Sequence, residues 1–422
     1  MERLNINKDV IFLRWTDAPV GENIVDVVLS IDAQVKRMYN QNVALANYSK
    51  LKPTLDSFDK IGYTIEGIEK AVKDLEGHRG EYLRSMAKSF RYYNRSLQGD
   101  KIPYDELMMG IQELPAYLIP EENIAKLKEI IDIQLLEIGY KGNVREKVAK
   151  WLQDTNIKPE NVVAYAKSIV KSARTDTLSR VVGLPEDEGI ESIKSIRGVY
   201  WSGYSAYVGN HKGTLTFNID RPWSEPIFTH VLTHEAYPGH QTFYCRWDYL
   251  YEKGELPLEA AYYLINSPTN ALFEGGPENA LHFLGWDCEN ENTPGISNKL
   301  KKQFVLAKNF SDMQRMAQTN ACYLVSTGKF EKDEAIKYLQ SLGMLGLIEA
   351  ENTYRFFTDP IKRMYYPCYY YGRWMIGKAY DLVPQEKRSE YYKILYDTPH
   401  TTKTFIKAIS NLTGTIFNPF EI

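Results

Sequence analysis

The chain has 422 residues, of which 44% are hydrophobic and 25% are charged, and its formal net charge is −3. This composition is typical of globular proteins, and the length allows a large core. The chain lacks the large positive excess that marks many nucleic-acid-binding proteins, and it has no run of about 18 apolar residues that could span a membrane. We therefore expect a globular protein without a nucleic-acid or membrane partner, in an oligomeric state that the sequence leaves open.

The cysteines and the N-terminus bear on the compartment. The four cysteines, at positions 245, 288, 322 and 368, are scattered and form no C-x-x-C pair. This spacing argues against a disulfide framework and against a cysteine zinc site. The apolar run at residues 10–13 is too short for the apolar region of a signal peptide. These features predict a cytoplasmic protein.

Helical periodicity dominates the first half of the chain. Apolar residues at 124, 127, 131, 135 and 138 are spaced by three or four positions, which places them on one face of a helix. Similar stripes predict helices over 24–46, 61–77, 82–97, 144–153 and 159–173. We expect these stripes to serve helix packing.

The pattern changes after residue 175. Residues 183–198 contain four Gly or Pro residues and several acidic ones, which predicts a linker. Residues 204–208 and 214–219 are rich in aromatic and β-branched residues and flank a turn-rich Gly-Asn-His-Lys-Gly segment, which indicates a β-hairpin. Helical patterns resume after Ser224 and predict helices over 256–290, 298–327, 331–342, 346–357, 373–381 and 386–396. The predicted fold is mainly α with a small β-sheet.

Residues 230–240 read His-Val-Leu-Thr-His-Glu-Ala-Tyr-Pro-Gly-His and contain three of the seven histidines. Neutral imidazoles bind zinc, and a carboxylate beside them can act as base toward a metal-activated water. Two ligand pairs compete. His230 and His234 are four residues apart and would meet on one face of a regular helix. His234 and His240 are six residues apart and would point away from each other unless the helix breaks between them.

Pro238-Gly239 supplies such a break, because proline removes an amide donor and glycine lets the backbone turn freely. The position of Glu235 favours the same pair. In the H-E-x-x-H zinc helix the glutamate follows the first ligand and acts as general base, and Glu235 follows His234. We therefore predict that His234 and His240 bind the metal and that His230 packs one turn earlier as a supporting residue.

A catalytic zinc ion usually has three protein ligands and one open position. The best third candidate is Glu274, which lies 40 residues after His234 in a helical pattern behind an apolar run. A carboxylate in that environment needs a cation partner. Glu278 and His282 follow at steps of four. The sequence leaves open whether Glu278 faces solvent, and whether His282 is a core residue or a substrate contact.

Residues 234–240, His-Glu-Ala-Tyr-Pro-Gly-His, resemble the H-E-x-x-P-G-H signature of the bacterial domain-of-unknown-function 885 family, which is grouped with the gluzincin metallopeptidases. Glu274-Gly275 matches the Glu-Gly pair that follows in that family, although residues 276–279 replace its usual W-A-L-Y. The similarity covers roughly residues 195–380. The resemblance implies Zn²⁺ held by His234, His240 and Glu274, Glu235 as general base, and a multi-helical gluzincin-like fold with a strand beside the active-site cleft.

Amide hydrolysis also needs a donor for the developing oxyanion besides the metal. The densest set of candidates is the tyrosine- and arginine-rich segment 363–373. Within it we predict Tyr370 or Tyr371 as the donor, and Arg373 or Arg363 as a bidentate partner for a substrate carboxylate.

The leading interpretation is a zinc metallopeptidase that acts on a peptide or small amide substrate. In it, residues 1–195 form an N-terminal helical region and residues 196–422 form the zinc-binding catalytic region, packed as one continuous unit. One alternative is a zinc amidohydrolase that acts on a non-peptide amide. Another is a non-catalytic peptide-binding protein on the same scaffold, against which Glu235 argues, because binding requires no general base.

Overall fold

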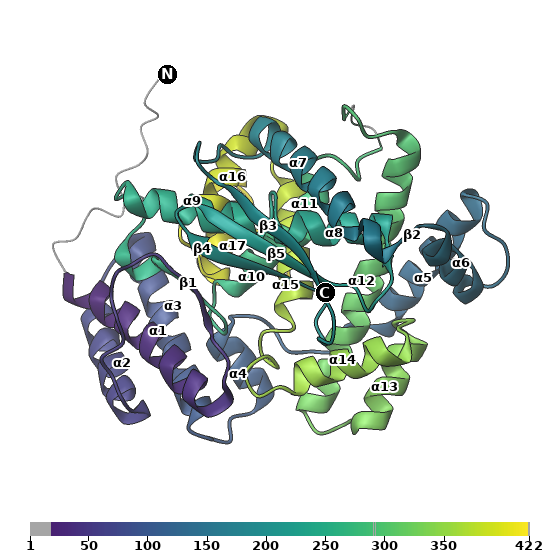
Figure 1. Cartoon of the computed structure of the whole chain (residues 1–422). Coiled ribbons are helices and arrows are strands. Elements are labelled where there is room, and N and C mark those ends of the chain that lie inside the picture. The colour runs from purple at the N-terminus through teal and green to yellow at the C-terminus, as the bar shows by residue number, and fades with distance from the viewer. Residues whose placement is uncertain (1–17, 290, 292, 421–422) are drawn as a thin grey trace.

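The computed structural model describes residues 18–289, 291 and 293–420, and this part of the chain is mainly helical with three small sheets (Figure 1). The mainly α prediction is thereby confirmed. In the described residues, no helix is long and apolar enough to cross a bilayer. The apolar run at residues 10–13 lies outside the described residues.

The first half of the chain forms a series of helices whose apolar stripes are buried as expected. In α2, for example, Ile61, Ile65 and Ile68 face the core, and the Ser57 hydroxyl caps the helix by accepting a hydrogen bond from the Lys60 amide. The helices of this half are α1 (Ala18–Tyr39), α2 (Phe58–Val72), α3 (Gly77–Leu97), α4 (Tyr104–Ile111), α5 (Glu121–Glu137), α6 (Val144–Asp154) and α7 (Val162–Arg180). The short helix α4 was not predicted, and the end of the predicted helix 24–46 is instead strand β1 (Ala44–Asn47).

The main sheet has the strand order β3-β5-β4. Strands β4 (Gly203–Gly209) and β5 (Lys212–Asn218) pair antiparallel, which confirms the predicted hairpin. The predicted linker is wrong in part: Gly189–Ile196 forms β3, which pairs parallel with β5. Two further pairs are β1 with β7 (Tyr262–Leu264) and β2 (Asn156–Ile157) with β6 (Trp223–Ser224). Because β5 is the central strand of this sheet, the edge that the hairpin presents is that of β4.

The second half of the chain is helical again after β6. Its helices are α8 (Glu225–Glu235), α9 (His240–Glu252), α10 (Asn270–Glu278), α11 (Ala280–Phe283), α12 (Asn298–Ser326), α13 (Lys332–Ser341), α14 (Leu347–Thr358), α15 (Cys368–Leu382), α16 (Arg388–Tyr396) and α17 (Thr402–Thr413). The prediction of helix throughout 256–290 is wrong, because β7 and a turn separate α9 from α10. In that turn the Asn270 side chain accepts from the Ser267 amide and donates to the Leu264 carbonyl.

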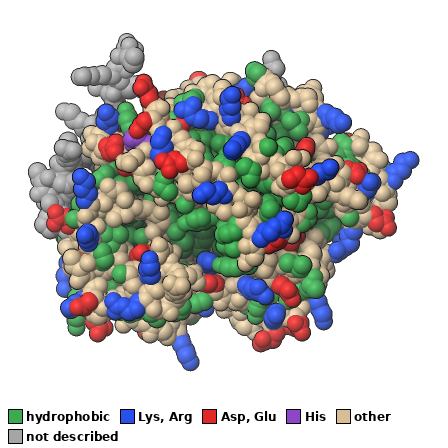
Figure 2. All heavy atoms as spheres, viewed as in Figure 1, with side chains coloured by type: hydrophobic (Ala, Val, Ile, Leu, Met, Phe, Trp, Pro, Cys, Tyr) green, Lys and Arg blue, Asp and Glu red, His purple; other side chains and the backbone are tan. Residues whose placement is uncertain are grey.

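One large hydrophobic cluster runs from Ile24 in α1 to Phe417 near the C-terminus, so both predicted regions contribute to it. A smaller cluster lies around Phe217, Trp223 and Phe228, between β5 and α8. The predicted boundary at 195/196 passes through strand β3. Figure 2 shows a hollow near the middle of one face, with mostly hydrophobic side chains inside it and charged side chains around it.

Helices α10 and α15 approach each other unusually closely, and glycines make this possible. A Cβ on Gly275 would lie 2.3 Å from the carbonyl oxygen of Gly372, and a Cβ on Gly372 would lie 2.2 Å from that of Ala271. A Cβ on Gly276 would lie 2.8 Å from the Phe243 ring of α9. The Gly-Gly run after Glu274 therefore fits α10 between α9 and α15, and this fixes where its carboxylates point.

Candidate metal centre

His234 and His240 lie on two different helices that meet at a sharp turn. His234 is in the last turn of α8, and His240 is the first residue of α9. The Gly239 amide donates to the Thr233 carbonyl at 3.1 Å, and a Cβ on Gly239 would lie only 1.8 Å from the His234 carbonyl oxygen. The predicted break between the two histidines is therefore confirmed. It brings their ring centroids to 4.8 Å from each other.

Glu274 joins these two histidines to form a group that we call the central cluster (His234, His240 and Glu274). Its Oε2 lies 3.3 Å from His234 Nε2, and its Oε1 lies 3.6 Å from His240 Nε2. Three ligands at about 2.0–2.1 Å from one tetrahedral metal are about 3.3–3.4 Å apart. Glu274 is 1% exposed, and its Oε2 makes no hydrogen bond. A buried carboxylate oxygen without a donor is costly, so these side chains fit a bound cation.

Electrostatics leave His240 ready to bind a metal. Burial lowers the pKa of His240 to about 4, so its imidazole is neutral near pH 7. Burial also lowers the pKa of His234, but contact with Glu274 and the charges of Glu278 and Glu274 outweigh it and raise the pKa overall.

Glu235 ends helix α8 beside the central cluster and is half-buried. Burial raises the pKa of Glu235 to about 7, and the negative charge of Glu274 adds to the shift. A backbone hydrogen bond from Ser205 in β4 lowers the pKa of Glu235 and so partly offsets this shift. A carboxylate with a pKa near the working pH is well suited to take up and release a proton.

Glu278, whose placement the sequence left open, is 2% exposed and lies behind the central cluster. Its Oε2 is 3.1 Å from His230 Nε2, and its Oε1 is 3.7 Å from His234 Nδ1. Burial raises its pKa, but the Arg315 guanidinium and the hydrogen bond from His230 outweigh burial and hold the pKa well below its usual range. An ionised carboxylate on the far side of a ligand histidine is a common feature of metal sites, where it fixes the ring orientation.

Arg373 is not free to meet a substrate carboxylate. It is 6% exposed, with Nη1 3.1 Å from Glu278 Oε2 and Nε paired with Asp312. Arg315 completes this support, with Nη2 2.8 Å from Glu278 Oε1. A buried guanidinium needs carboxylate partners, so the structure places Arg373 as a support of Glu278 instead of in the predicted substrate contact.

The structure does not bring Tyr370 and Tyr371 to the central cluster. Tyr370 stacks on Trp374 at a centroid distance of 6.4 Å, and the Tyr371 hydroxyl donates to the Tyr117 carbonyl at 3.4 Å. The Tyr371 ring also packs against Tyr117 and Phe420, so these contacts of both side chains lie outside the central cluster.

Two other tyrosines reach the central cluster. The Tyr365 hydroxyl donates to Glu274 Oε1, and the Tyr369 ring stacks on His234 at 6.2 Å. On α15, residues 369, 372 and 376 are spaced by three or four and share one face, while Tyr365 lies in the turn before the helix. The sequence contains a signal for this choice, because Gly372 marks the face that a neighbouring helix approaches.

His282 is fully occupied by other partners. Its Nδ1 lies 3.0 Å from Asp287 Oδ1, and its Nε2 lies 3.3 Å from Asp381 Oδ1. Of the two interpretations that the sequence left open, this placement fits a histidine satisfied by structural partners.

The comparisons with known proteins inform the fold alone. No protein-family model and no curated protein matches the chain. The structure is similar to a "putative lipoprotein" from Colwellia psychrerythraea, with a TM-score of 0.56 and 12% identity over 94% of this chain and 75% of that one. It is also similar to one of unknown function from Shewanella oneidensis, with a TM-score of 0.50 and 14% identity over 85% and 73% of the two chains.

Proposed function

We propose that the protein is a zinc-dependent metallopeptidase with His234, His240 and Glu274 as the metal ligands, in keeping with its resemblance to the domain-of-unknown-function 885 family. The observation that carries the proposal is the convergence of two imidazole nitrogens on a buried carboxylate whose Oε2 has no hydrogen-bond partner. Glu235, with a pKa near 7, lies beside them. A binding protein would have no use for a carboxylate tuned in this way.

A bound Zn²⁺ supplies a Lewis acid that polarises a carbonyl and lowers the pKa of water. Glu235 accepts a proton from the water that attacks the carbonyl carbon, so that its carboxylate becomes a carboxylic acid. It then returns this proton to the leaving nitrogen as the carbon–nitrogen bond breaks. The products are a carboxylic acid and an amine, and Glu235 is ionised again.

We propose Tyr369 as the donor for the oxyanion that develops during the attack. The Tyr369 ring stacks on His234, and the Arg315 guanidinium lies 4.4 Å from the centroid of the Tyr369 ring. Burial, followed by the charge of Glu274, raises the pKa of Tyr369 well above its usual value, which keeps the phenol protonated. Tyr365 and Glu278 have positioning roles, because they hold Glu274 and His234 respectively.

The sheet favours a peptide over a small amide as substrate. In the sheets formed by the described residues, β4 pairs with β5 only, so its other edge is available to an extended chain. Ser205 of this strand contacts Glu235 through its backbone. An extended peptide that adds to a strand edge gains main-chain hydrogen bonds along its length, and β4 would deliver its scissile bond beside the base.

Peptide-library hydrolysis by zinc-loaded wild type and Glu235→Gln tests the proposal. We expect cleavage by the wild type and a loss on the order of 10²–10⁴-fold in the variant, with zinc still bound. Glu225→Gln, at the exposed opposite end of α8, is the matched control and should keep full activity.

The outcomes also separate the alternatives. If the protein cleaves non-peptide amides and leaves peptides intact, an amidohydrolase is favoured. Peptide binding without cleavage of either class would favour a binding protein. Absence of zinc together with absence of any Glu235-dependent hydrolysis would overturn the proposal.

A further inference from the structure

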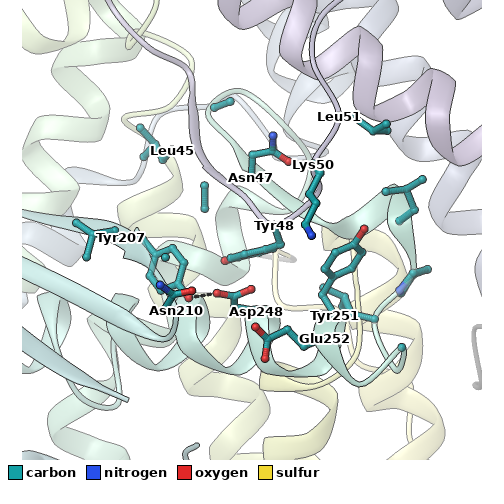
Figure 3. A pocket seen from close by; sticks show the side chains of 18 residues that line it. Leu45, Asn47, Tyr48, Lys50, Leu51, Tyr207, Asn210, Asp248, Tyr251 and Glu252 are labelled. Atoms are coloured by element: carbon teal, nitrogen blue, oxygen red, sulfur yellow. Dashed lines mark hydrogen bonds between the residues drawn. The ribbon is translucent and has the colours of Figure 1, made fainter. Parts of the chain in front are cut away.

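A second group of a histidine and carboxylates lies at the other end of α9, beside a pocket of about 990 Å³. We call it the turn cluster (His211, Asp248 and Glu252). Figure 3 shows Asp248 and Glu252 of α9 facing the pocket, with Tyr207 and Asn210 of the hairpin on one side and Tyr48 above. His211 follows Asn210 in the tight turn between β4 and β5, where both residues have a positive φ, as two-residue hairpin turns require.

His211 has one occupied ring nitrogen and one without a hydrogen bond. The residue is 5% exposed, and Nδ1 lies 2.8 Å from Asp187 Oδ1. Nε2 is buried and makes no hydrogen bond, although it lies 3.3 Å from Glu252 Oε2. A buried imidazole nitrogen that faces a carboxylate without bonding to it is an incomplete arrangement, because a buried polar atom normally has a partner.

Asp248 lies one turn before Glu252 on α9. One ligand atom from each of His211, Asp248 and Glu252 lies within 4.8 Å of the other two. Asp248 also accepts a hydrogen bond from the Tyr207 hydroxyl. Together with Asp187, three carboxylates surround one imidazole. The nearby Lys212 ammonium donates to the Asp187 carbonyl, and Lys50 lines the pocket.

We propose that the turn cluster is a second divalent-cation site, of the zinc class, with His211 Nε2, Asp248 and Glu252 as ligands. The 3.3 Å between His211 Nε2 and Glu252 Oε2 matches the separation of about 3.3–3.4 Å between two ligands of one zinc ion. Imidazole and carboxylate together suit a first-row transition cation. Asp187 on Nδ1 fixes the ring with Nε2 inward, which is the usual arrangement behind a histidine ligand. Water from the pocket would complete the coordination.

The cation would fasten the hairpin turn to α9, the helix that begins with His240. A chain of aromatic contacts joins the two ends of the helix: Tyr207 lies 5.5 Å from Tyr244, and Tyr244 stacks on His240 at 6.0 Å, both between ring centroids. The turn cation therefore supports the part of the fold that holds one ligand of the central cluster. The proposal stands on its own residues and does not require that the protein be a peptidase.

Zinc stoichiometry, measured by elemental analysis after equilibration with buffered Zn²⁺, tests this site. We expect two zinc ions per chain in the wild type and one in Glu252→Gln, whose side chain is 53% exposed and tolerates the change. His211→Ala should give the same loss. Glu255→Gln, three residues beyond Glu252 and also exposed, is the matched control and should keep both ions.

Zinc binding at the two sites can be distinguished with a variant that lacks a ligand of the central cluster. In His240→Ala one zinc ion should remain, and adding Glu252→Gln should remove it. If wild type and Glu252→Gln bind the same number of zinc ions, or if His240→Ala binds none while circular dichroism shows it folded, the turn cluster is not a cation site.

Discussion

Among the described residues, three groups place one or two histidines beside carboxylate or thiol groups, and they differ in how the ring nitrogens are used. Around His282 both nitrogens lie within hydrogen-bonding distance of an aspartate, Asp287 on one side and Asp381 on the other. In the central cluster, His234 Nε2 faces a carboxylate oxygen of Glu274 that has no hydrogen-bond partner. The nitrogens of His282 both have partners, whereas the central cluster leaves a buried carboxylate oxygen that the proposed cation would satisfy.

The comparison shows how similar residue types can form either an ion pair, as around His282, or a candidate set of metal ligands, as in the central cluster. Burial lowers the pKa of His282, but the contacts with Asp287 and Asp381 outweigh it and raise the pKa to about 12, so the ring is an imidazolium cation. A metal ligand must instead be neutral, and burial lowers the pKa of His240 to about 4. The turn cluster resembles the central one, since His211 Nε2 has no hydrogen bond.

Of the three changes that test this comparison, the largest expected effect concerns the tyrosines of α15. Tyr369→Phe should lower kcat on the order of 10²-fold, because it removes one donor to the oxyanion. Tyr370→Phe is the matched control: it removes a hydroxyl from the next residue, which stacks on Trp374 away from the central cluster. Steady-state kinetics of both variants check this. Equal kcat values for the two variants would mean that the Tyr369 hydroxyl takes no part in the reaction.

The carboxylates behind the histidines should differ in their effect on the metal. Glu278→Gln should weaken zinc binding by about 10–100-fold, because it removes the charge that orients His234. Asp287→Asn, which alters the His282 group, should leave zinc affinity unchanged. Competition titrations with a chelator measure both. A zinc affinity that falls equally in the two variants would mean that Glu278 acts through general stability.

The smallest effect is a pH dependence of stability at His282. Because folding raises the pKa of His282 from 6.5 to about 12, the pair stabilises the folded state fully below pH 6.5 and loses this contribution as the pH rises. His282→Asn should therefore cost about 2 kcal/mol more at pH 6 than at pH 8. Urea unfolding of both proteins at the two pH values checks the sign. A cost independent of pH would mean that folding does not raise the pKa of His282.

The fold was predictable where local pattern decides it. The apolar stripes of α2 and α12 and the hairpin of β4 and β5 follow from spacing alone. Strand β3 was missed because its burial alternates weakly, and its pairing partner lies on the far side of β4 in the sequence. The break after His234 was predictable because Pro238 and Gly239 are local signals.

The supporting residues of the site were harder to find because they depend on packing between distant helices. Arg315 of α12 reaches Glu278 of α10, and no spacing in the sequence connects them. The sequence nevertheless contains two signals for these residues. Gly372 marks the face of α15 that approaches α10 and thus selects Tyr369 over Tyr370. On α9, positions 240, 244, 248 and 252 repeat every four residues and form one stripe from the central cluster to the turn cluster.

Anomalous diffraction at the zinc absorption edge, from crystals of zinc-loaded wild-type protein, tests the central claim most directly. We predict a peak bonded to His234 Nε2, His240 Nε2 and a carboxylate oxygen of Glu274. A peak held instead by His230, His234 and Glu278, or no peak near these histidines at saturating zinc, would contradict the account.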